Sequence, residues 1–556
     1  MVIKSISFKF GGSPGAKPLS FEPPAVTVFV GPNNSGKSLV LRELSLMLNN
    51  EVSEPQTKII DTVAFRPFGR VEAIAEVNRL DATPHAQETV HSGNMIVAHS
   101  TYRNQISRNG LLSALLDPEA NRGFFIGRYL RFQTMGLDGQ SRLTLANNAP
   151  SQNFLAPPNN PLDLLIRDNA RRGELRRIVH DAFGRYLVMD TTQPSLLRLR
   201  FADREPTEDE ERSFKEVAVT FHQKTEPLEE FSDGVRAFVG TLIQVIAGEP
   251  RILTMDEPEA FLHPALAFSL GKEICHLLAF SDRQFFAATH SPDFVMGCVA
   301  AGALVSIVRL THDKQVSSAR LLPHAEMKAL MRKPMLRSTG ALRGLFYSSV
   351  VVTEADADRA FYAEINERLL TFEPLRGIPN ALFLNANGVD TIAEIVAPLR
   401  ALGIPAAMIV DLDVVEKGGA NWAKFMDACG VPEIERHALE VNRKSVRDAL
   451  VTACPDYKRN GGIDVLSQAD KEAASNFLSR LSEYGMFVVG RGEVEYWLSD
   501  LPLDRSKHKW LHGVFEKLGD TPESSEYVRP NSGDVWKFLF DLKGWLVDPA
   551  KKGVRD

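Results

Sequence analysis

Two stretches of the chain repeat the same pattern, an apolar strand followed by an amphipathic helix. The first is AVTVFV, which leads through a glycine-containing loop into SLVLRELSLML. The second begins near residue 347 and reads SSVVVT, DADRAFYAEINERLL, ALFLNA, DTIAEIVAPLRAL and PAAMIVDLD. Strands that alternate with helices in this way form mostly parallel sheets. The pattern therefore predicts an α/β protein with two separate sheets.

The remaining stretches have weaker patterns. Residues 160–187 carry apolar side chains at helical spacing among many arginines, which predicts helices. The acidic run at 203–216 is typical of a solvated loop. Residues 231–310 return to alternation of strands and helices, whereas residues 501–556 are mixed and predict no particular element.

Composition limits the classes of protein that fit. A chain of 556 residues is too long for one core, because single cores stop growing at roughly 250–300 residues. The net charge is −6, so contact with nucleic acid would depend on local basic patches. The four cysteines are scattered, which disfavours zinc ribbons and disulfide frameworks. No apolar run reaches the ~18 residues that cross a bilayer, and MVIKSISFKF has the alternating pattern of a strand, which differs from the apolar run expected of a signal peptide. We expect a cytoplasmic protein without membrane contact.

The loop GPNNSGKS has the spacing of a phosphate-binding loop. Its glycines, Gly31 and Gly36, let backbone N–H groups surround phosphate oxygens, and Asn34 lies between them. Lys37 reaches the β- and γ-phosphates, and Ser38 is suited to Mg²⁺. The preceding strand and following helix are the required context. The cofactor prediction is ATP with Mg²⁺ or Mn²⁺.

Two later strand ends complete this nucleotide site. In RILTMDEPEA, Asp256 would hold Mg²⁺ and Glu257 would polarise the attacking water. His290 follows the next apolar strand and could contact the γ-phosphate, although a histidine in that position alone is more often structural.

The stretch FSDGVR resembles the signature motif of ABC-type ATPases. In that family Ser232 and Gly234 would contact the γ-phosphate of a partner subunit, which implies a homodimer or higher homo-oligomer. The form DEPEAFLHP is similar to the branch that contains RecF, SMC-like and OLD-family proteins. Taken alone, Ser232 could equally be a plain helix cap.

A second group of acids lies in the second α/β stretch. Glu354 ends one predicted strand and Asp358 lies one helical turn beyond it, whereas Asp411 and Asp413 end a later strand. Side chains at i and i+2 of a strand share a face, so both aspartates could address one ion. Carboxylates gathered at a sheet edge repel one another unless a divalent cation is bound. The alternative is an ordinary acidic helix start.

These residues resemble a TOPRIM domain, with NANGVDTI as its middle strand and turn and with Ala355 where the family commonly has glycine. Asp356 would be the spare acid. Glu493 and Glu495, in VVGRGEVEYWL, are similar to the final acidic segment, where one glutamate helps to bind a second metal. Lys507, Lys509 and Lys517 are candidates for an assisting lysine.

An ABC-type ATPase followed by TOPRIM resembles the OLD (overcoming lysogenization defect) family, which includes the nuclease of the Gabija defence system. The resemblance implies an ATPase domain at 1–345 with a helical, possibly dimerising, insert at about 155–190. A TOPRIM nuclease domain at 346–500 and its extension at 501–556 would follow. It also implies an ATP-regulated endonuclease that uses two divalent cations to cut DNA in anti-phage defence, with a possible partner protein. The alternatives are a TOPRIM ribonuclease that cuts tRNA or other RNA, and a RecF- or SMC-like ATPase that binds DNA without cutting it.

Overall fold

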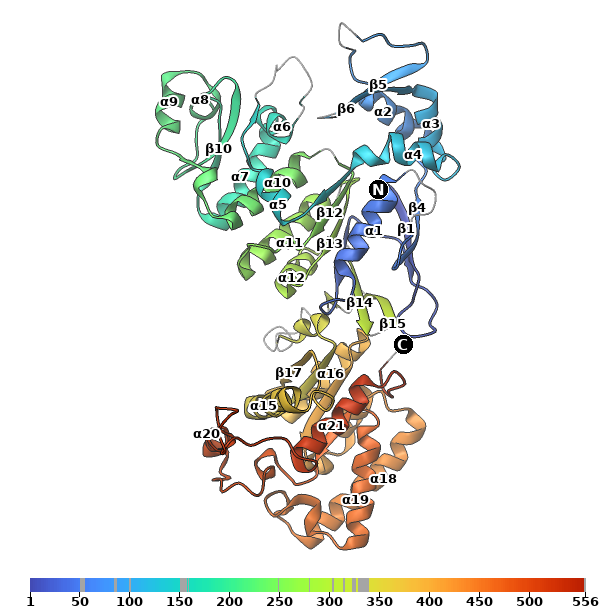
Figure 1. Ribbon diagram of the computed structural model, residues 1–556, viewed down its shortest axis with the longest axis vertical. Coiled ribbons are helices and arrows are strands. Elements are labelled where there is room, and N and C mark those ends of the chain that lie inside the picture. The colour runs from blue at the N-terminus through green and yellow to red at the C-terminus, as the bar shows by residue number, and fades with distance from the viewer. Residues whose placement is uncertain are drawn as a thin grey trace. The chain divides into compact units, whose positions relative to one another are not determined.

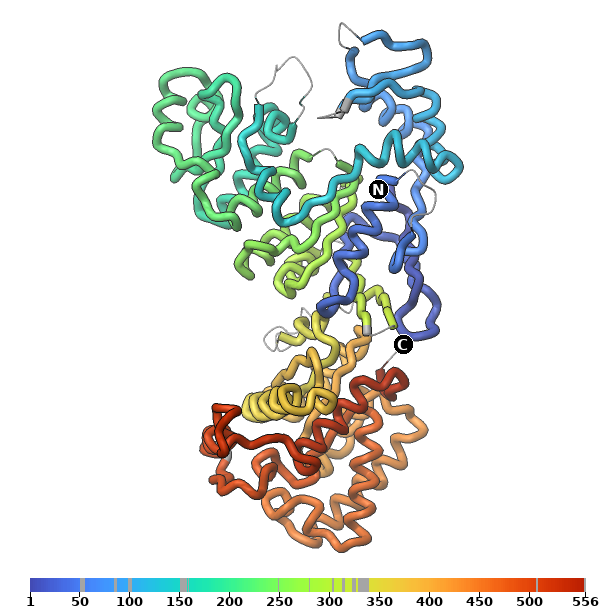
Figure 2. Tube along the Cα trace, in the orientation of Figure 1, coloured from blue at the N-terminus to red at the C-terminus, as the bar shows by residue number. Residues whose placement is uncertain are grey.

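The protein was analysed as a computed structural model, shown as a ribbon in Figure 1 and as a chain trace in Figure 2. The structure describes residues 1–50, 56–84, 88–99, 102–150, 158, 160–248, 250–279, 281–302, 305–313, 316–322, 327–328 and 340–554. It divides into two compact units. One comprises Met1–Val30 and Asn34–Lys328, and the other comprises Gly31–Asn33 and Ala329–Asp556. Each unit is described by itself.

The larger unit is organised around a six-stranded sheet with the order β15-β14-β3-β13-β12-β7. Every neighbouring pair is parallel except β14 with β15. All residues of β3 and β13 are buried, as expected for parallel strands that helices cover on both faces. The strands are β3 (Val26–Val30), β7 (Thr134–Leu137), β12 (Ile252–Asp256), β13 (Gln284–Ala288), β14 (Val305–Asp313) and β15 (Val316–Leu322). Its helices are α1 (Lys37–Asn49), α5 (Gly139–Thr144), α10 (Asp233–Ala247), α11 (Pro264–Leu278) and α12 (Pro292–Ala300).

Two smaller sheets extend this unit. The order β2-β1-β4 is antiparallel throughout, and β5 pairs with β6 as a hairpin. Their apolar side chains join those of α1 and the main sheet in one core. The elements are β1 (Ile3–Phe8), β2 (Ser20–Phe21), β4 (Ile60–Phe65), β5 (Asn94–His99), β6 (Tyr102–Ser107), α2 (Arg70–Leu80), α3 (Arg108–Leu116), α4 (Arg122–Arg128) and η1 (Leu130–Gln133).

A lobe between β7 and β12 carries the arginine-rich helices that the sequence predicts. It contains β8 (Ala149–Pro150), α6 (Pro161–Arg167), α7 (Asn169–Phe183), β9 (Tyr186–Asp190), β10 (Leu196–Ala202), α8 (Glu208–Arg212), α9 (Glu216–His222), β11 (Glu226–Pro227) and η2 (Leu228–Glu230). Residues 155–157 and 159 of the predicted insert lie outside the described residues.

The acidic run at 203–216 is not simply a solvated loop, so that prediction was wrong. It forms α8 and most of the turn before α9, and Glu211 is buried. Glu211 accepts hydrogen bonds from Arg172 at 3.1 Å, from Arg176 at 2.5 Å and from the backbone N–H of Met189 at 3.0 Å. Arginines of α7 therefore draw one acid of the run into the core.

The smaller unit has a four-stranded parallel sheet with the order β17-β16-β18-β19. Its strands are β16 (Ser349–Thr353), β17 (Ala381–Asn385), β18 (Ala406–Asp411) and β19 (Met486–Val489). Helices α15 (Asp356–Phe372) and α16 (Val389–Ala401) follow β16 and β17, as the alternating pattern predicts. The prediction of an α/β protein is confirmed for both units.

A helical insertion separates β18 from β19, and a helical segment follows β19. The insertion contains η4 (Leu412–Glu416), α17 (Gly419–Ala428), α18 (Glu433–Ala453), η5 (Tyr457–Arg459), η6 (Gly462–Val465) and α19 (Gln468–Ser482). After β19 come η7 (Val494–Tyr496), α20 (Lys507–Leu518) and α21 (Asp534–Val547). Trp510 and Trp536 of the last two helices share a core with Phe361 and Tyr362 of α15. The segment 501–556, which had no clear pattern, therefore helps to build this unit.

Candidate functional sites

The glycine-rich loop after β3 has the backbone conformation of a phosphate cradle. Gly31, Asn34 and Gly36 all have positive φ, at 148°, 60° and 93°. At a φ of 93° any side chain on Gly36 would be strained, and its Cβ atom would also lie 2.6 Å from Ile59 Cδ1, so glycine is favoured there. The loop ends at the N-terminus of α1, where backbone N–H groups and the helix dipole favour an anion.

The cradle lysine is held out of water. Lys37 is only 4% exposed, and its ammonium is 3.5 Å from Ser35 Oγ. Burial lowers the pKa of Lys37 to about 8, against the opposing attraction of Asp256 and Glu257. A buried ammonium gains a strong partner when a phosphate binds, because the two charges then meet at low dielectric.

The cradle and the strand end predicted for Mg²⁺ lie in contact. Ser38 Oγ donates a hydrogen bond to Asp256 Oδ1 at 3.1 Å, although the two residues are 218 positions apart. The sheet order explains this contact, since β12 is one strand removed from β3 and all three carboxyl ends share one edge. A hydroxyl and a carboxylate side by side are ligands that suit Mg²⁺, so these residues fit the predicted ion.

Glu257 and His290 lie near each other at the same sheet edge. His290 Nε2 is 3.9 Å from Glu257 Oε1, and both side chains are exposed. Glu257 has a positive φ of 50°, which is unusual outside glycine. Burial, and then the charge of Lys37, lower the pKa of His290, so it is neutral near pH 7 and can donate or accept a hydrogen bond.

Two residues that sequence reasoning missed shape this edge. Glu259 Oε1 accepts the backbone N–H of His290 at 2.8 Å, and burial raises the pKa of this glutamate. Arg142, on α5, is completely buried and donates to the backbone carbonyls of Glu257 and Pro258, both at 2.8 Å. Arg142 lies 115 positions from Glu257 in the chain, and no short motif includes it.

The signature-like turn begins helix α10. Ser232 is the N-cap residue, but its exposed hydroxyl makes no capping hydrogen bond. Ser232 therefore stands at the N-cap position, as the alternative reading expects, but its hydroxyl does not cap the helix through a hydrogen bond. A Cβ atom on Gly234 would lie 2.5 Å from the backbone oxygen of Phe261, so this turn packs tightly against the loop after Asp256.

The smaller unit brings its predicted acids together at the carboxyl edge of the parallel sheet. Glu354 follows β16 and its Oε1 accepts the backbone N–H of Asp411, the last residue of β18, at 2.8 Å. Asp358 Oδ2 accepts the backbone N–H of Ala355 at 3.0 Å and thereby caps α15 beside Glu354. Asp356 instead contacts Arg359 at 2.7 Å and Asn385 at 3.2 Å.

The carboxylates influence one another's protonation. Burial raises the pKa of Glu354 to about 7, and the charges of Asp413 and Asp358 add to this rise. Burial raises the pKa of Asp411 well above its usual range, with further contributions from Glu354, Asp358, Asp413 and Glu495. We call these five residues the carboxylate cluster: Glu354, Asp358, Asp411, Asp413 and Glu495. Repulsion of this kind is relieved by a proton or by a cation.

One geometric prediction about the cluster was wrong. Strand β18 ends at Asp411, and Asp413 lies in the 3-10 helix η4, so the two are not i and i+2 neighbours on a strand. Just beyond the strand end, the backbone N–H of Leu412 bonds to Gly492 O at 2.9 Å. Across the described residues, no three histidine, cysteine, aspartate or glutamate side chains form a ready-made metal group. Donors of the chain hold Glu354 Oε1, Asp358 Oδ2 and Asp413 Oδ2, whereas Asp413 Oδ1 is buried and makes no hydrogen bond among the described residues. The oxygens present are of the kind that suits a divalent cation.

The loop that carries the last two predicted acids is fastened by three side chains. Tyr362 accepts the indole N–H of Trp497 at 2.8 Å, Asp534 accepts the backbone N–H of Leu498 at 2.7 Å, and Arg505 donates to the backbone oxygen of Glu495. Glu493 and Glu495 themselves are 8% and 7% exposed. Of these two acids, Glu495 is the one that raises the pKa of Asp411.

The lysine in contact with the cluster is not one that the sequence analysis considered. Lys458, in η5, donates to Asp413 Oδ2. Lys509 lies 3.8 Å from Asp504 with its side chain 77% exposed, so it interacts elsewhere. Lys458 follows Asp413 by 45 residues, inside the helical insertion, and no local signal marks it.

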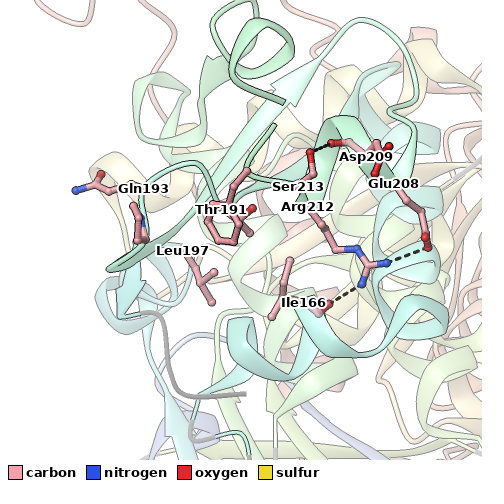
Figure 3. Close-up of a pocket in the computed structure, with 10 residues that line it drawn as sticks. Ile166, Thr191, Gln193, Leu197, Glu208, Asp209, Arg212 and Ser213 are labelled. Atoms are coloured by element: carbon pink, nitrogen blue, oxygen red, sulfur yellow. Dashed lines mark hydrogen bonds and ion pairs between the residues drawn. The ribbon is translucent and has the colours of Figure 1, made fainter. Parts of the chain in front are cut away.

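A pocket of about 330 Å³ opens in the lobe of the larger unit (Figure 3). Arg212 spans one side, donating to Ile166 O at 3.3 Å and contacting Glu208 at 2.9 Å, and Phe214 is exposed at its rim. None of the predicted site residues lines this pocket. In the described ranges, no helix has the length and apolar character required to span a membrane.

Comparison with protein families identifies a known type of domain in the larger unit. Residues 113–296 match the family model "AAA domain, putative AbiEii toxin, Type IV TA system". That range contains Ser232, Asp256 and His290 and lies after the cradle loop. The match covers well under half of the chain, and no curated protein matches the chain.

Solved structures similar to the chain include SMC heads. One is the SmcHead bound to the C-winged helix domain of ScpA, with 15% identity over 58% of this chain and 97% of that chain and a TM-score of 0.33. Another is the SMC head domain from Thermotoga maritima, with 15% identity over 58% of this chain and 100% of that chain and a TM-score of 0.29. A third is a Pyrococcus furiosus Smc head domain bound to the C-terminal domain of ScpA, with 14% identity over 60% of this chain and 99% of that chain and a TM-score of 0.30. The family match and the cradle together identify an ATPase-type domain in this chain.

Proposed function

We propose that this protein is an ATP-regulated, divalent-cation-dependent endonuclease of the OLD type, with a TOPRIM-like second unit. The observation that carries the proposal is the hydrogen bond from the Asp411 backbone N–H to Glu354 Oε1, 2.8 Å long. It joins acids that are 57 positions apart at one sheet edge. Acids gathered there are the ligand type that Mg²⁺ and Mn²⁺ prefer.

In the ATPase half, each predicted residue has a distinct task. The cradle of Gly31, Asn34 and Gly36 would bind phosphates through backbone N–H groups, and Lys37 would neutralise their charge. Ser38 and Asp256 would hold Mg²⁺. Glu257 would orient the attacking water, and His290, whose Nε2 is 3.9 Å from Glu257 Oε1, would contact the γ-phosphate. Ser232 and Gly234 would complete the site of a second copy, so the functional form is a homodimer or larger assembly.

In the nuclease half, Glu354, Asp358, Asp411 and Asp413 would hold the divalent cation, with Glu495 or Glu493 beside them. A bound cation supplies Lewis-acid stabilisation at the scissile phosphate and a reactive water. Two hydrogen bonds support this arrangement: Glu354 accepts the backbone N–H of Asp411, and Asp358 accepts the backbone N–H of Ala355, so both carboxylates would be oriented for the ion. The raised pKa values of Glu354 and Asp411 mean that these two carboxyls give up protons when the cation binds.

DNA is the proposed substrate, with RNA as the second candidate for the same chemistry. We place the protein in the cytoplasm, in anti-phage defence, with a possible partner protein. We propose an ATPase domain at 1–345 with an insert at about 155–190, a TOPRIM domain at 346–500 and its extension at 501–556. A RecF- or SMC-like ATPase that binds DNA without cutting it would have no use for the cluster.

The test is incubation with supercoiled plasmid and with tRNA in Mg²⁺ or Mn²⁺, with and without ATP. Glu354→Gln keeps an oxygen that can accept the Asp411 N–H but removes the charge, so the fold should persist and cleavage should be lost. Glu472→Gln is the matched control, because Glu472 is an exposed acid on α19. Cleavage of tRNA but not of plasmid would select the ribonuclease alternative.

Two outcomes would contradict the proposal. One is Glu354→Gln cutting as fast as the parent, which would place the chemistry elsewhere. The other is a protein that hydrolyses ATP and is inert on every nucleic acid with every cation, which would favour the ATPase that binds without cutting.

A further inference from the structure

The turn between helices α18 and α19 presents a lysine to the carboxylate cluster. The ammonium of Lys458 donates to Asp413 Oδ2, and the two side chains are only 26% and 28% exposed. An ion pair shielded in this way is stronger than a surface pair, because water screens it less. Lys458 therefore already contributes one positive charge to a group of acids that otherwise repel one another.

The position of this lysine is fixed by the fold. Its neighbour Tyr457 is buried and donates to Glu416 Oε1 at 2.8 Å, and Glu416 lies on the same 3-10 helix as Asp413. A Cβ atom on Gly492 would lie 2.1 Å from the backbone oxygen of Lys458. The turn and the segment that carries Asp413 are thus packed against one framework, so the ion pair is more than a chance contact of a long side chain.

Asp413 divides its two oxygens between different roles. Oδ2 accepts from Lys458, whereas Oδ1 is buried and, among the described residues, has no hydrogen-bond partner. An ammonium and a divalent cation cannot share one oxygen without strong mutual repulsion. The space beside Oδ2 is therefore taken by Lys458, and Asp413 Oδ1 together with Glu354, Asp358 and Asp411 is left for a metal ion.

We propose that Lys458 is the built-in cation of this site and takes the place of a second divalent ion. The cluster then binds one divalent cation per chain, and the Lys458 ammonium contacts a non-bridging oxygen of the substrate phosphate, for which an ammonium is well suited. This proposal rests on the proposed nuclease function and differs from the two-cation arrangement that the family resemblance implies.

The test measures metal binding and cleavage separately. Mn²⁺ is titrated calorimetrically into the nucleotide-free full chain, and the ions that Glu354→Gln abolishes are assigned to the cluster. The parent should bind one such ion. Lys458→Met should bind Mn²⁺ about tenfold more tightly or take a second ion, because a competing charge is gone. The same variant should cut nucleic acid about tenfold more slowly.

The controls separate charge from structure. Lys471→Met removes a lysine of the same unit that pairs with Asp464 outside the cluster, and it should change neither quantity. Lys458→Arg keeps the charge and should keep the parent's Mn²⁺ stoichiometry. Thermal unfolding of Lys458→Met shows whether the unit still folds, and Gly492→Ala, which displaces the Lys458 backbone, should shift Mn²⁺ binding in the same direction as Lys458→Met.

Three results would contradict the proposed role of Lys458. Two cluster ions in the parent would overturn the proposal, and so would unchanged Mn²⁺ binding in a folded Lys458→Met. If Glu354→Gln leaves all Mn²⁺ binding and cleavage intact, the proposed function itself fails, and the role of Lys458 falls with it.

Discussion

The two candidate sites have the same scaffold and opposite charge. Both lie at the carboxyl edge of a parallel sheet, one beyond β3, β13 and β12 and the other beyond β16 and β18. In the first, a buried lysine stands at a helix N-terminus, which suits an anion. In the second, carboxylates converge, which suits a cation. The sheet edge thus brings residues from distant parts of the sequence together, and the charge of their side chains determines which ligand binds.

Burial also shifts the pKa values of the two sites in opposite directions. Burial lowers the pKa of Lys37 to about 8 and raises the pKa of Glu354 to about 7. In each case burial disfavours the charged form of the side chain, and a ligand of opposite charge would favour it. A site of this kind stores part of its binding free energy as an unfavourable charge in the ligand-free protein.

The largest expected effect is that of Lys37→Ala, which should impair the nucleotide site and leave the carboxylate cluster unchanged. Lys37→Ala removes the cation of the cradle and should lower ATP turnover by about 100-fold or more. Binding of Mn²⁺ to the carboxylate cluster should be unchanged, because it lies in the other sheet. ATP turnover and Mn²⁺ titration on the same preparation check both statements. Unchanged turnover would mean that the cradle has been misidentified.

The next comparison concerns the arginines that fasten the loops of the two sites. Arg142 is fully buried and donates to the carbonyls of Glu257 and Pro258, whereas Arg505 is partly exposed and donates to the carbonyl of Glu495. Replacing a buried arginine leaves carbonyls without partners. Arg142→Met should therefore cost about 3 kcal/mol of unfolding free energy and Arg505→Met about 1 kcal/mol.

Chemical denaturation followed by intrinsic fluorescence measures both changes. Arg177→Met serves as a control for Arg142→Met, since Arg177 is a half-exposed arginine on α7 with ion pairs at the surface. Equal losses for Arg142→Met and Arg177→Met would show that Arg142 has no special part in holding the loop after Asp256.

The opposite charge of the sites predicts opposite dependence on pH. Above pH 8 the neutral form of Lys37 predominates and must take up a proton before phosphate binds, so ATP affinity should fall by up to about tenfold per pH unit. Below pH 7 the cluster around Glu354 holds a proton that the cation must displace, so Mn²⁺ affinity should rise with pH until about 7 and then level off.

Calorimetry in buffers of different ionisation enthalpy tests this directly. ATP binding at pH 9 should take up protons, and Mn²⁺ binding at pH 6 should release them. Lys37→Arg, which stays charged, should flatten the first profile, and Glu354→Gln should flatten the second. Profiles of the same sign in both sites would refute the comparison.

Sequence patterns predict those parts of both sites whose residues lie close together in the chain or come at the end of an apolar strand. Strand, glycine loop and helix are consecutive, so Lys37 and Ser38 can be found from spacing alone, and Asp256 and Glu354 follow apolar strands. Asp413 was misjudged because the strand ends at Asp411 and the chain continues as the 3-10 helix η4, where the Leu412 N–H bonds to Gly492, 80 residues later. Arg142 and Lys458 could not be found, since each reaches its site from a distant short helix that no motif describes.

A smaller effect is expected at Ser232, in the turn before α10 that would contact the nucleotide of a second copy of the chain. The Ser232 hydroxyl makes no capping bond, so Ser232→Ala should change the unfolding free energy by less than about 0.5 kcal/mol. If the hydroxyl contacts a partner's nucleotide, ATP turnover should still fall about fivefold, the loss of one hydrogen bond. Ser291→Ala is the control, because Ser291 does cap α12 and should lose stability instead. Full turnover by Ser232→Ala would remove the argument for a shared site.

The smallest expected effect distinguishes two acids in the first turn of α15. Asp356 is paired with Arg359 and Asn385, and Arg359 holds its pKa below the usual range, whereas Asp358 contributes to the raised pKa of Glu354 and Asp411. Asp356→Asn should therefore change cleavage and Mn²⁺ affinity by no more than about twofold, as for an exposed ion pair. Asp358→Asn, which alters the same functional group two residues later, should weaken Mn²⁺ binding clearly. If the two variants behave alike, the cluster is defined by charge density near α15 and not by which carboxylates face the sheet edge.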